Sequence, residues 1–196
     1  MLDRHLLRTT PETAMAQGLS AGIRFFQYRD KNGSRRSVYE ASLALAGIAR
    51  SEGALFIVND HADIAAAVDA HGVHLGQDDL PIGAAKKIAG TERIIGISTH
   101  SREEALRAEE AGADYIGFGP IFTTQTKDAG QAQGLAALSA LKSSVRIPVI
   151  AIGGITINNC KSVHDAGADG MAVISAILSA ADPEDAARTM LSIVMP

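Results

Sequence analysis

The strongest constraint on the fold is a regular alternation of two kinds of segment along the chain. Short apolar runs rich in Val, Ile and Phe are separated by alanine-rich stretches with helical spacing. This pattern is typical of a parallel sheet built from strand–helix units, and near-continuous apolarity indicates strands covered on both faces. We predict strands at residues 22–28, 54–58, 72–75, 93–97, 114–118, 147–152 and 170–174.

A weak internal repeat supports one unit used many times. Segments beginning at Ala21, Ala70, Ala111 and Ala166 each end a helix at a glycine and lead into a strand. Polar and glycine residues follow almost every strand, and in a (β/α)₈ barrel these carboxyl ends form one mouth. We therefore predict an α/β fold, a single (β/α)₈ TIM barrel over residues 1–196. The alternative is a doubly wound open sheet, but no glycine-rich dinucleotide motif follows the first predicted strand.

Composition limits the classes of partner. A chain of 196 residues, 46% of them hydrophobic, is long enough for one core. With a net charge of −4 and scattered Lys and Arg, it has no basic stripe for nucleic acid. We find no membrane-spanning apolar run and no signal-peptide pattern, so we expect a cytoplasmic protein with no membrane association. The single cysteine, Cys160, excludes an internal disulfide and is expected to be a buried filler.

Carboxylates follow two successive predicted strands. Asp60 comes after the run LFIVN, and the pair Asp78 and Asp79 comes after GVHLGQ. Carboxylates from adjacent strand ends can share a hard cation such as Mg²⁺, which keeps several waters and takes its remaining ligands from substrate phosphates. The sequence therefore predicts a Mg²⁺ site at this part of the mouth.

Basic residues nearby suggest that the metal acts with a phosphate. Arg29 and Lys31 lie two apart on an extended segment and so face the same way, and Lys127 comes from another loop. Taken alone, Arg29 and Lys31 could equally be solvated charges at a strand end. Together with the two carboxylate positions they favour a clamp for phosphate oxygens.

A second phosphate site is suggested near the last two strands. Gly153 and Gly154 form a glycine turn, and Ile174 and Ser175 lie where a short helix would begin after the last strand. Exposed backbone amides in such segments bind phosphate in many barrels. A tight turn is the alternative explanation of the glycines. His74 lies between Val73 and Leu75 on a predicted strand. This position favours an interior side chain with hydrogen-bonded ring nitrogens over a direct chemical role.

Several motifs in order closely resemble the thiamine phosphate synthase family over about residues 22–177: QYRDK, NDH, GVHLGQDDLP, GISTH, GADYIGFGPIFTTQTK, PVIAIGGI and GADGMAVISAI. The resemblance implies a Mg²⁺-dependent transferase that joins 4-amino-5-hydroxymethyl-2-methylpyrimidine diphosphate to a thiazole phosphate, giving thiamine phosphate and diphosphate. It also implies that diphosphate leaves first and that the thiazole nitrogen attacks the resulting pyrimidine carbocation.

The resemblance further implies roles for individual residues. The pyrimidine diphosphate would be held by Gln27, Arg29, Lys31 and Asn59, with Ser98 and Lys127 at the diphosphate. Mg²⁺ would lie on Asp60 and Asp79, the latter matching better than Asp78. The thiazole would contact Thr124 and Thr126, and its phosphate would contact Gly154, Ile174 and Ser175. Arg29, Ser98 and Lys127 would serve catalysis, since a leaving group with several negative charges needs cations and donors but no protein nucleophile.

The chain departs from the family pattern at its start. Family members usually begin with a strand of the LYLVTD type, whereas this chain opens MLDRHLL. We therefore expect a truncated or irregular first strand. Two other functions stay open: a thiazole tautomerase on the same fold, and a non-catalytic phosphate-ligand-binding barrel. The QYRDK motif with Asn59, Asp60 and Asp79 favours the synthase, because an isomerase has no need of a metal and diphosphate site. A homo-oligomer is possible.

Overall fold

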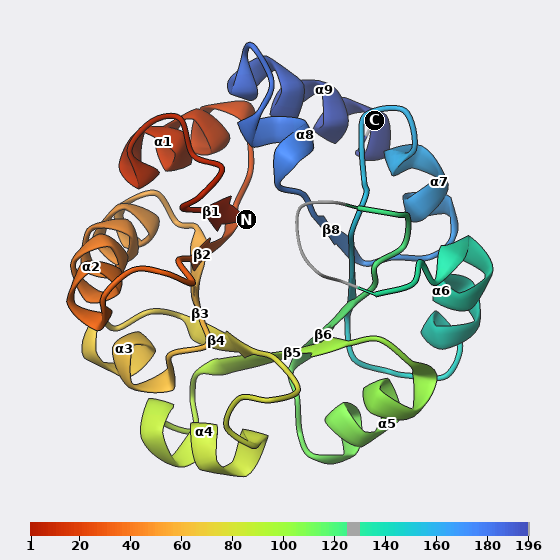
Figure 1. Ribbon diagram of the computed structural model, residues 1–196, viewed down its shortest axis with the longest axis horizontal. Helices are drawn as coiled ribbons and strands as arrows, with labels where there is room; N and C mark the ends of the chain where they lie inside the picture. Colours follow the sequence, from red (N-terminus) through yellow and green to blue (C-terminus); the bar gives the residue numbers. More distant parts are fainter. Residues whose placement is uncertain (125–129, 196) are drawn as a thin grey trace.

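The structure, a computed structural model, describes residues 1–124 and 130–195, and its strands and helices alternate as predicted (Figure 1). Eight parallel strands pair in sequence order within one sheet, which curls around the centre of the molecule with the helices outside. The strands are β1 Leu2–Asp3, β2 Phe25–Arg29, β3 Leu55–Asn59, β4 Gly72–Leu75, β5 Ile94–Thr99, β6 Tyr115–Phe118, β7 Val149–Ile152 and β8 Gly170–Ala172. Every predicted strand is present, and the (β/α)₈ prediction is confirmed.

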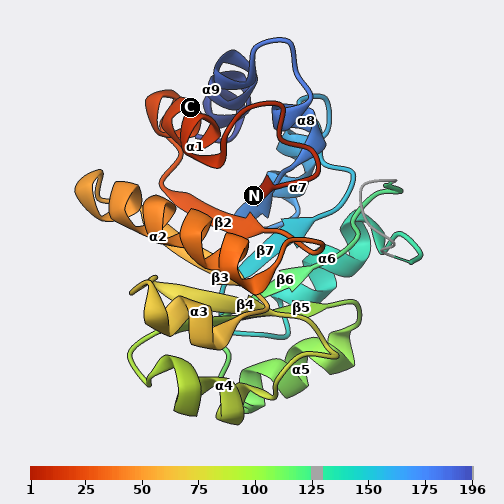
Figure 2. The same ribbon diagram turned by 60° about the vertical axis from the view of Figure 1, so that its left-hand side comes forward.

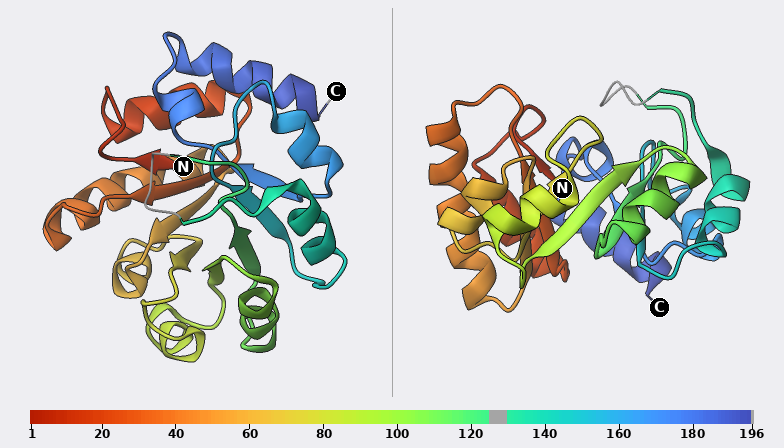
Figure 3. Two further views of the ribbon diagram at one scale, coloured as in Figure 1. Left: turned by 45° about the vertical axis from the view of Figure 1, so that its right-hand side comes forward. Right: turned by 90° about the horizontal axis from the view of Figure 1, so that it is seen from below.

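The helices cover the outer surface of the strands, as the two further views show (Figure 3). They are α1 Pro11–Ala21, α2 Arg35–Ser51, α3 Ala62–Ala67, α4 Ile82–Ala89, α5 Arg102–Glu110, α6 Gly134–Lys142, α7 Cys160–Asp165, α8 Ser175–Leu178 and α9 Pro183–Val194. Because α9 packs against α1, it closes the ring of helices, and α8 is a short extra helix at the end of β8 (Figure 2). In the described part of the chain, no helix is both long and apolar enough to span a membrane.

Helix ends follow local sequence signals. The hydroxyls of Thr10, Ser34 and Ser101 each accept a hydrogen bond from a backbone N–H in the first turn of the following helix. Glu104 faces back toward the start of α5, where its carboxylate accepts from the backbone N–H of His100 at 2.7 Å. These hydrogen bonds fix the residue at which each helix begins, and so they also fix where the preceding loop at the mouth ends.

Glycines on two neighbouring strands make room for large polar side chains inside the barrel. A Cβ atom on Gly96 of β5 would lie 2.1 Å from the ring of Tyr115, and one on Gly117 of β6 would lie 3.2 Å from the ring of His74. The interior at this height is thus filled by Tyr115 and His74 where branched apolar side chains are usual in such barrels. This polar layer forms the floor beneath the mouth.

The first strand is truncated, as predicted, and leaves a seam in the barrel. β1 has two residues, which pair with Tyr28 and Arg29 of β2. Among the described residues no strand ladder joins β8 to β1, and the Met1 amine donates to the carbonyl oxygen of Val173 at 3.1 Å across this gap. The barrel is therefore held together at this point by far fewer hydrogen bonds than elsewhere.

This seam should be the first part of the sheet to open. We expect amides of β1 and β8 to exchange with solvent at least ~10-fold faster than those of β6, because β6 has a ladder on both sides and four buried residues. Native-state hydrogen exchange followed by mass spectrometry would measure this difference. Equal protection of β8 and β6 would mean that the barrel closes as firmly at the seam as elsewhere.

Candidate functional site

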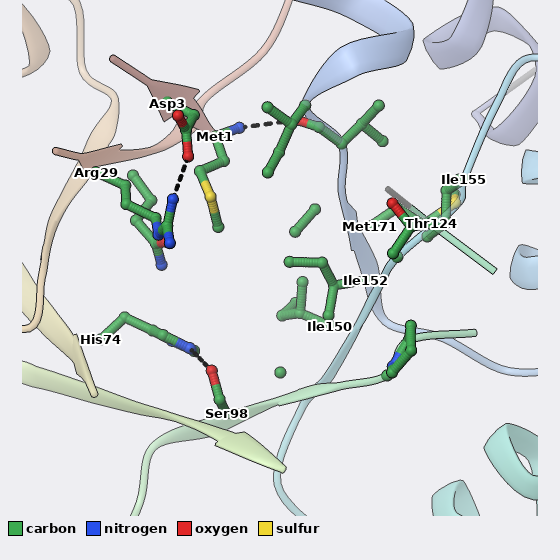
Figure 4. Close-up of a pocket in the computed structure, with 18 of the residues that line it drawn as sticks. Met1, Asp3, Arg29, His74, Ser98, Thr124, Ile150, Ile152, Ile155 and Met171 are labelled. Atoms are coloured by element: carbon green, nitrogen blue, oxygen red, sulfur yellow. Dashed lines mark hydrogen bonds and ion pairs between the residues drawn. The ribbon is translucent and has the colours of Figure 1, made fainter. Parts of the chain in front are cut away.

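A cavity opens at the carboxyl ends of the strands and contains most of the residues that the sequence singles out (Figure 4). The predicted residues that line it are Gln27, Arg29, Asn59, Ser98, Thr124, Gly154, Ile174 and Ser175. They come from both halves of the chain, and the topology alone brings them to one mouth. Thr126 and Lys127 lie outside the described residues.

The two predicted metal ligands lie near each other and near Lys31, and none of the three is among the residues that line the cavity, although Asn59, directly before Asp60, is. Asp60 accepts from the Lys31 ammonium at 2.7 Å, and Asp79 accepts from the backbone N–H of Gly76 at 2.7 Å. Burial raises the pKa of Asp79, the Gly76 N–H acts against this, and the neighbouring Asp60 raises it further. Asp78 is exposed. The structure therefore pairs Asp60 with Asp79, the aspartate that matches the family better.

This carboxylate pair offers only part of a coordination shell. Within residues 1–124 and 130–195 no group of three or more His, Cys, Asp or Glu side chains is gathered around one point. Mg²⁺ commonly binds to one or two carboxylates and completes its octahedron with water and substrate phosphate oxygens. The hard oxygen donors and the repulsion between Asp60 and Asp79 fit such an ion.

Arg29 projects into the cavity from the end of β2 and is anchored from β1. Its Nη1 donates to Asp3 Oδ2 at 2.5 Å, and both side chains are largely buried. The Arg29 Nε is buried with no hydrogen-bond partner among the described residues. Arg29 and Lys31 therefore each pair with a carboxylate, Arg29 with Asp3 in the cavity wall and Lys31 with Asp60, the residue after Asn59, and each cation keeps further donors for an anion.

A chain of hydrogen bonds crosses the floor of the cavity. The two ring nitrogens of His74 bond to the Tyr115 hydroxyl and to Ser98 Oγ, each at 2.9 Å. His74 is 7% exposed, so the prediction of an interior ring with satisfied nitrogens is confirmed. Burial raises the pKa of Tyr115 above its ordinary value, which keeps its hydroxyl protonated. Gln77 fixes the same segment by donating to the Ser98 carbonyl at 2.6 Å.

The glycine turn after β7 is required both by its backbone conformation and by its packing. Gly153 and Gly154 have φ angles of +97° and +66°, which favour glycine. A Cβ on Gly154 would lie 2.7 Å from the Cβ of Phe122 and 2.8 Å from the Thr123 carbonyl oxygen. A side chain at this position would therefore collide with the loop after β6. Gly154 is therefore required by packing whatever binds at its amide.

The segment after β8 that the sequence predicts to bind phosphate lines the same cavity. Ile174 is the residue before α8, and Ser175 opens that short helix with its side chain exposed. The wall that faces Arg29 across the cavity is largely apolar and includes Ile150, Ile152 and Met171 (Figure 4). The cavity thus has charged groups on one side and, facing them, an apolar surface that suits uncharged rings.

Two residues of this arrangement were not expected from the sequence. Asp3 lies in a segment too short to show a strand pattern, and Tyr115 appears as one apolar letter in the run DYIGF. The alternation of side chains along a strand places Tyr115, Gly117 and Gly119 on one face. A tyrosine among glycines on an inward face is the signal that could have indicated Tyr115.

Comparison with known proteins gives a consistent result over almost the whole chain. A family model described as thiamine monophosphate synthase matches residues 2–177. The thiamine-phosphate synthase of Chlorobium luteolum is 49% identical over 187 residues, which cover 95% of this chain and 88% of that protein. That of Syntrophomonas wolfei is 46% identical over 178 residues, 90% of this chain and 85% of that protein. The solved structure of thiamine phosphate pyrophosphorylase from Pyrococcus furiosus has a TM-score of 0.91 and 41% identity, covering 98% of this chain and 93% of that one.

Proposed function

The chain belongs to the thiamine monophosphate synthase family, and we propose that its barrel mouth couples 4-amino-5-hydroxymethyl-2-methylpyrimidine diphosphate with a thiazole phosphate to give thiamine phosphate and diphosphate. One observation carries the assignment of this chemistry to the mouth. A single cavity is lined by Arg29, by Asn59 and by the backbone around Gly154, Ile174 and Ser175, and the Lys31–Asp60 ion pair begins directly after Asn59. Two phosphorylated substrates can therefore meet in this cavity.

On this proposal Asp60 and Asp79 hold Mg²⁺. They fit because burial and, after it, the neighbouring Asp60 raise the pKa of Asp79, and a divalent cation would offset the repulsion between the two carboxylates. When bound, Mg²⁺ neutralises charge on the diphosphate and stabilises it as a leaving group. Lys31, which pairs with Asp60 at 2.7 Å, would supply a further cation for the diphosphate.

Arg29 and Ser98 orient the diphosphate for departure. The Arg29 guanidinium offers a planar set of donors, and Ser98 offers a hydroxyl whose oxygen is held 2.9 Å from His74 Nε2. Preorganised donors of this kind stabilise charge that develops on a leaving group. No covalent bond to the protein is needed, because the second substrate supplies the nucleophilic nitrogen.

The thiazole phosphate would bind at the other end of the cavity. Its phosphate would lie on the backbone amides around Gly154, Ile174 and Ser175, and its ring on the apolar wall with Thr124 beside it. That wall keeps water away from the site where the two rings join. A tautomerase would use this end alone, so the carboxylate pair and Arg29 favour the synthase over it.

Release of diphosphate tests the proposal directly. We expect diphosphate to be released only when both substrates and Mg²⁺ are present, and we expect chelation of the metal with EDTA to stop it. Enzyme-coupled detection of diphosphate, with thiamine phosphate measured by chromatography, would report both products. A tautomerase would change the thiazole substrate without the pyrimidine, and a binding barrel would bind both substrates but release no diphosphate.

A further inference from the structure

Asp3 is a buried carboxylate to which neither the sequence motifs nor the proposed function gives a role. It is 3% exposed and lies opposite Arg29 in the register of β1 and β2. Its Oδ2 accepts from Arg29 Nη1 at 2.5 Å (Figure 4). In the described part of the chain it is the one carboxylate that forms an ion pair with Arg29. A buried acid facing a cavity-lining arginine invites a functional explanation.

The Asp3 carboxylate is itself held in place by the turn that follows it. Its Oδ1 accepts from the backbone N–H of His5 at 3.1 Å. The Asp3 carbonyl oxygen accepts from the N–H groups of Leu6 and Leu7 at 3.0 and 3.1 Å. One carboxylate oxygen thus accepts a hydrogen bond from the backbone, and the other accepts one from the guanidinium. Asp3 is therefore a fixed acceptor, not a mobile counter-ion.

We propose that Asp3 is a positioning residue for Arg29, holding the guanidinium so that its remaining N–H groups point at the diphosphate of the pyrimidine substrate. This inference rests on the proposed function. An arginine side chain has many rotamers, and one charge-assisted hydrogen bond at its tip removes most of that freedom before substrate binds. Asp3 also keeps the guanidinium from being a buried charge without a partner. The residue acts through Arg29 and need not touch the substrate.

The variant Asp3→Asn separates this role from a general effect on the fold. It keeps the size of the side chain and an acceptor for the His5 N–H, but it removes the charge that holds Arg29. We expect binding of the pyrimidine diphosphate in the presence of Mg²⁺ to weaken by ~10-fold or more, and binding of the thiazole phosphate to change by less than about twofold. Calorimetry with each substrate alone measures both constants. Loss of both in equal measure would indicate a structural role and overturn the inference.

A double-mutant cycle tests whether Asp3 acts through Arg29. If it does, the double variant Asp3→Asn with Arg29→Ala should bind pyrimidine diphosphate as weakly as Arg29→Ala alone, because the positioned group is already gone. The matched control is Asp69→Asn. Asp69 pairs with Arg50 and Arg93 on the exposed surface before β4, so this variant should bind both substrates normally.

The outcomes distinguish the inference from its premise. If Arg29→Ala leaves pyrimidine diphosphate binding unchanged, the proposed role of Arg29 is wrong. If Arg29→Ala weakens binding but Asp3→Asn does not, or if the two effects add, Asp3 has no positioning role and the proposed function stands. Should Asp3→Asn fail to fold, Asp3→Glu keeps the charge and shifts the carboxylate by one methylene. We then expect Asp3→Glu to weaken binding of the pyrimidine diphosphate and to leave binding of the thiazole phosphate nearly unchanged. If Asp3→Glu binds both substrates as tightly as the parent protein does, the inference is contradicted.

Discussion

Changing Asp60 or Asp79 to Asn is expected to lower the rate of thiamine phosphate formation by roughly 100-fold or more at millimolar Mg²⁺ without unfolding the protein. Each change removes a negative charge from the proposed metal site but keeps the size of the side chain. Asp60 has a φ angle of +67°, and Asn is among the few residues that adopt this conformation readily. Steady-state rates over a range of Mg²⁺ concentrations would show whether the metal requirement has moved.

The same variants should also differ from the parent protein in how Mg²⁺ changes the Tm. A raised pKa in the folded state means that protonated Asp79 favours folding, and this contribution is lost as the pH rises through the folded-state pKa. At neutral pH ionised Asp79 therefore lowers the free energy of unfolding, and bound Mg²⁺ would offset this loss. We expect Mg²⁺ to raise the Tm of the parent protein, and we expect Asp79→Asn to lose that increase.

Asp78→Asn is the matched control for this experiment. Asp78 is adjacent to Asp79 but exposed, so the same substitution there should leave both the rate and the Mg²⁺-dependent rise in Tm unchanged. If Asp60→Asn and Asp79→Asn keep the parent's activity and its Mg²⁺ dependence, the metal assignment is wrong. A loss of activity in Asp78→Asn as large as in Asp79→Asn would move the site to the outer aspartate.

The strands were predictable because each is a run of apolar residues covered on both faces, a pattern that a single sequence carries. Their ends were less so. The last predicted strand extends to residue 174, whereas β8 ends at Ala172, since Val173 and Ile174 lead across the seam into α8. β1 has two residues, too few for any period to show. Its role as the anchor of Arg29 depends on register with β2, which only the folded structure supplies.

Candidate site residues were predictable where a single charged or polar residue at the end of a strand indicates its own chemical role. Asp60, Arg29 and Ser175 stand where a barrel gathers functional groups, and the order of the motifs carries the rest. Contacts between side chains were not predictable. The choice of Ser98 as a partner of His74 depends on facing positions of neighbouring strands, and the need for glycine at Gly154 comes from a loop more than 30 residues earlier.

The two phosphate sites should respond to different substitutions. Arg29→Ala is expected to weaken binding of the pyrimidine diphosphate by about 10- to 100-fold, because it removes a largely buried cation from that end of the cavity. Binding of the thiazole phosphate should change little. Gly154→Val does not probe the other end cleanly, since its Cβ would collide with Phe122 before it met a ligand.

Ser175→Asp is the sharper probe of the thiazole phosphate end. Ser175 is exposed at the start of α8, so a carboxylate there should be tolerated by the fold but should repel a phosphate on the adjacent amides. We expect binding of the thiazole phosphate to weaken by ~10-fold or more, with the pyrimidine diphosphate less affected because Ser175 is not among its proposed contacts. Ser179→Asp, at the other end of α8, makes the same change away from the cavity and should bind both substrates normally.

If Arg29→Ala and Ser175→Asp impair both ligands equally while both variants remain folded, the two phosphates share one undivided pocket, and the division between side-chain and backbone sites is wrong.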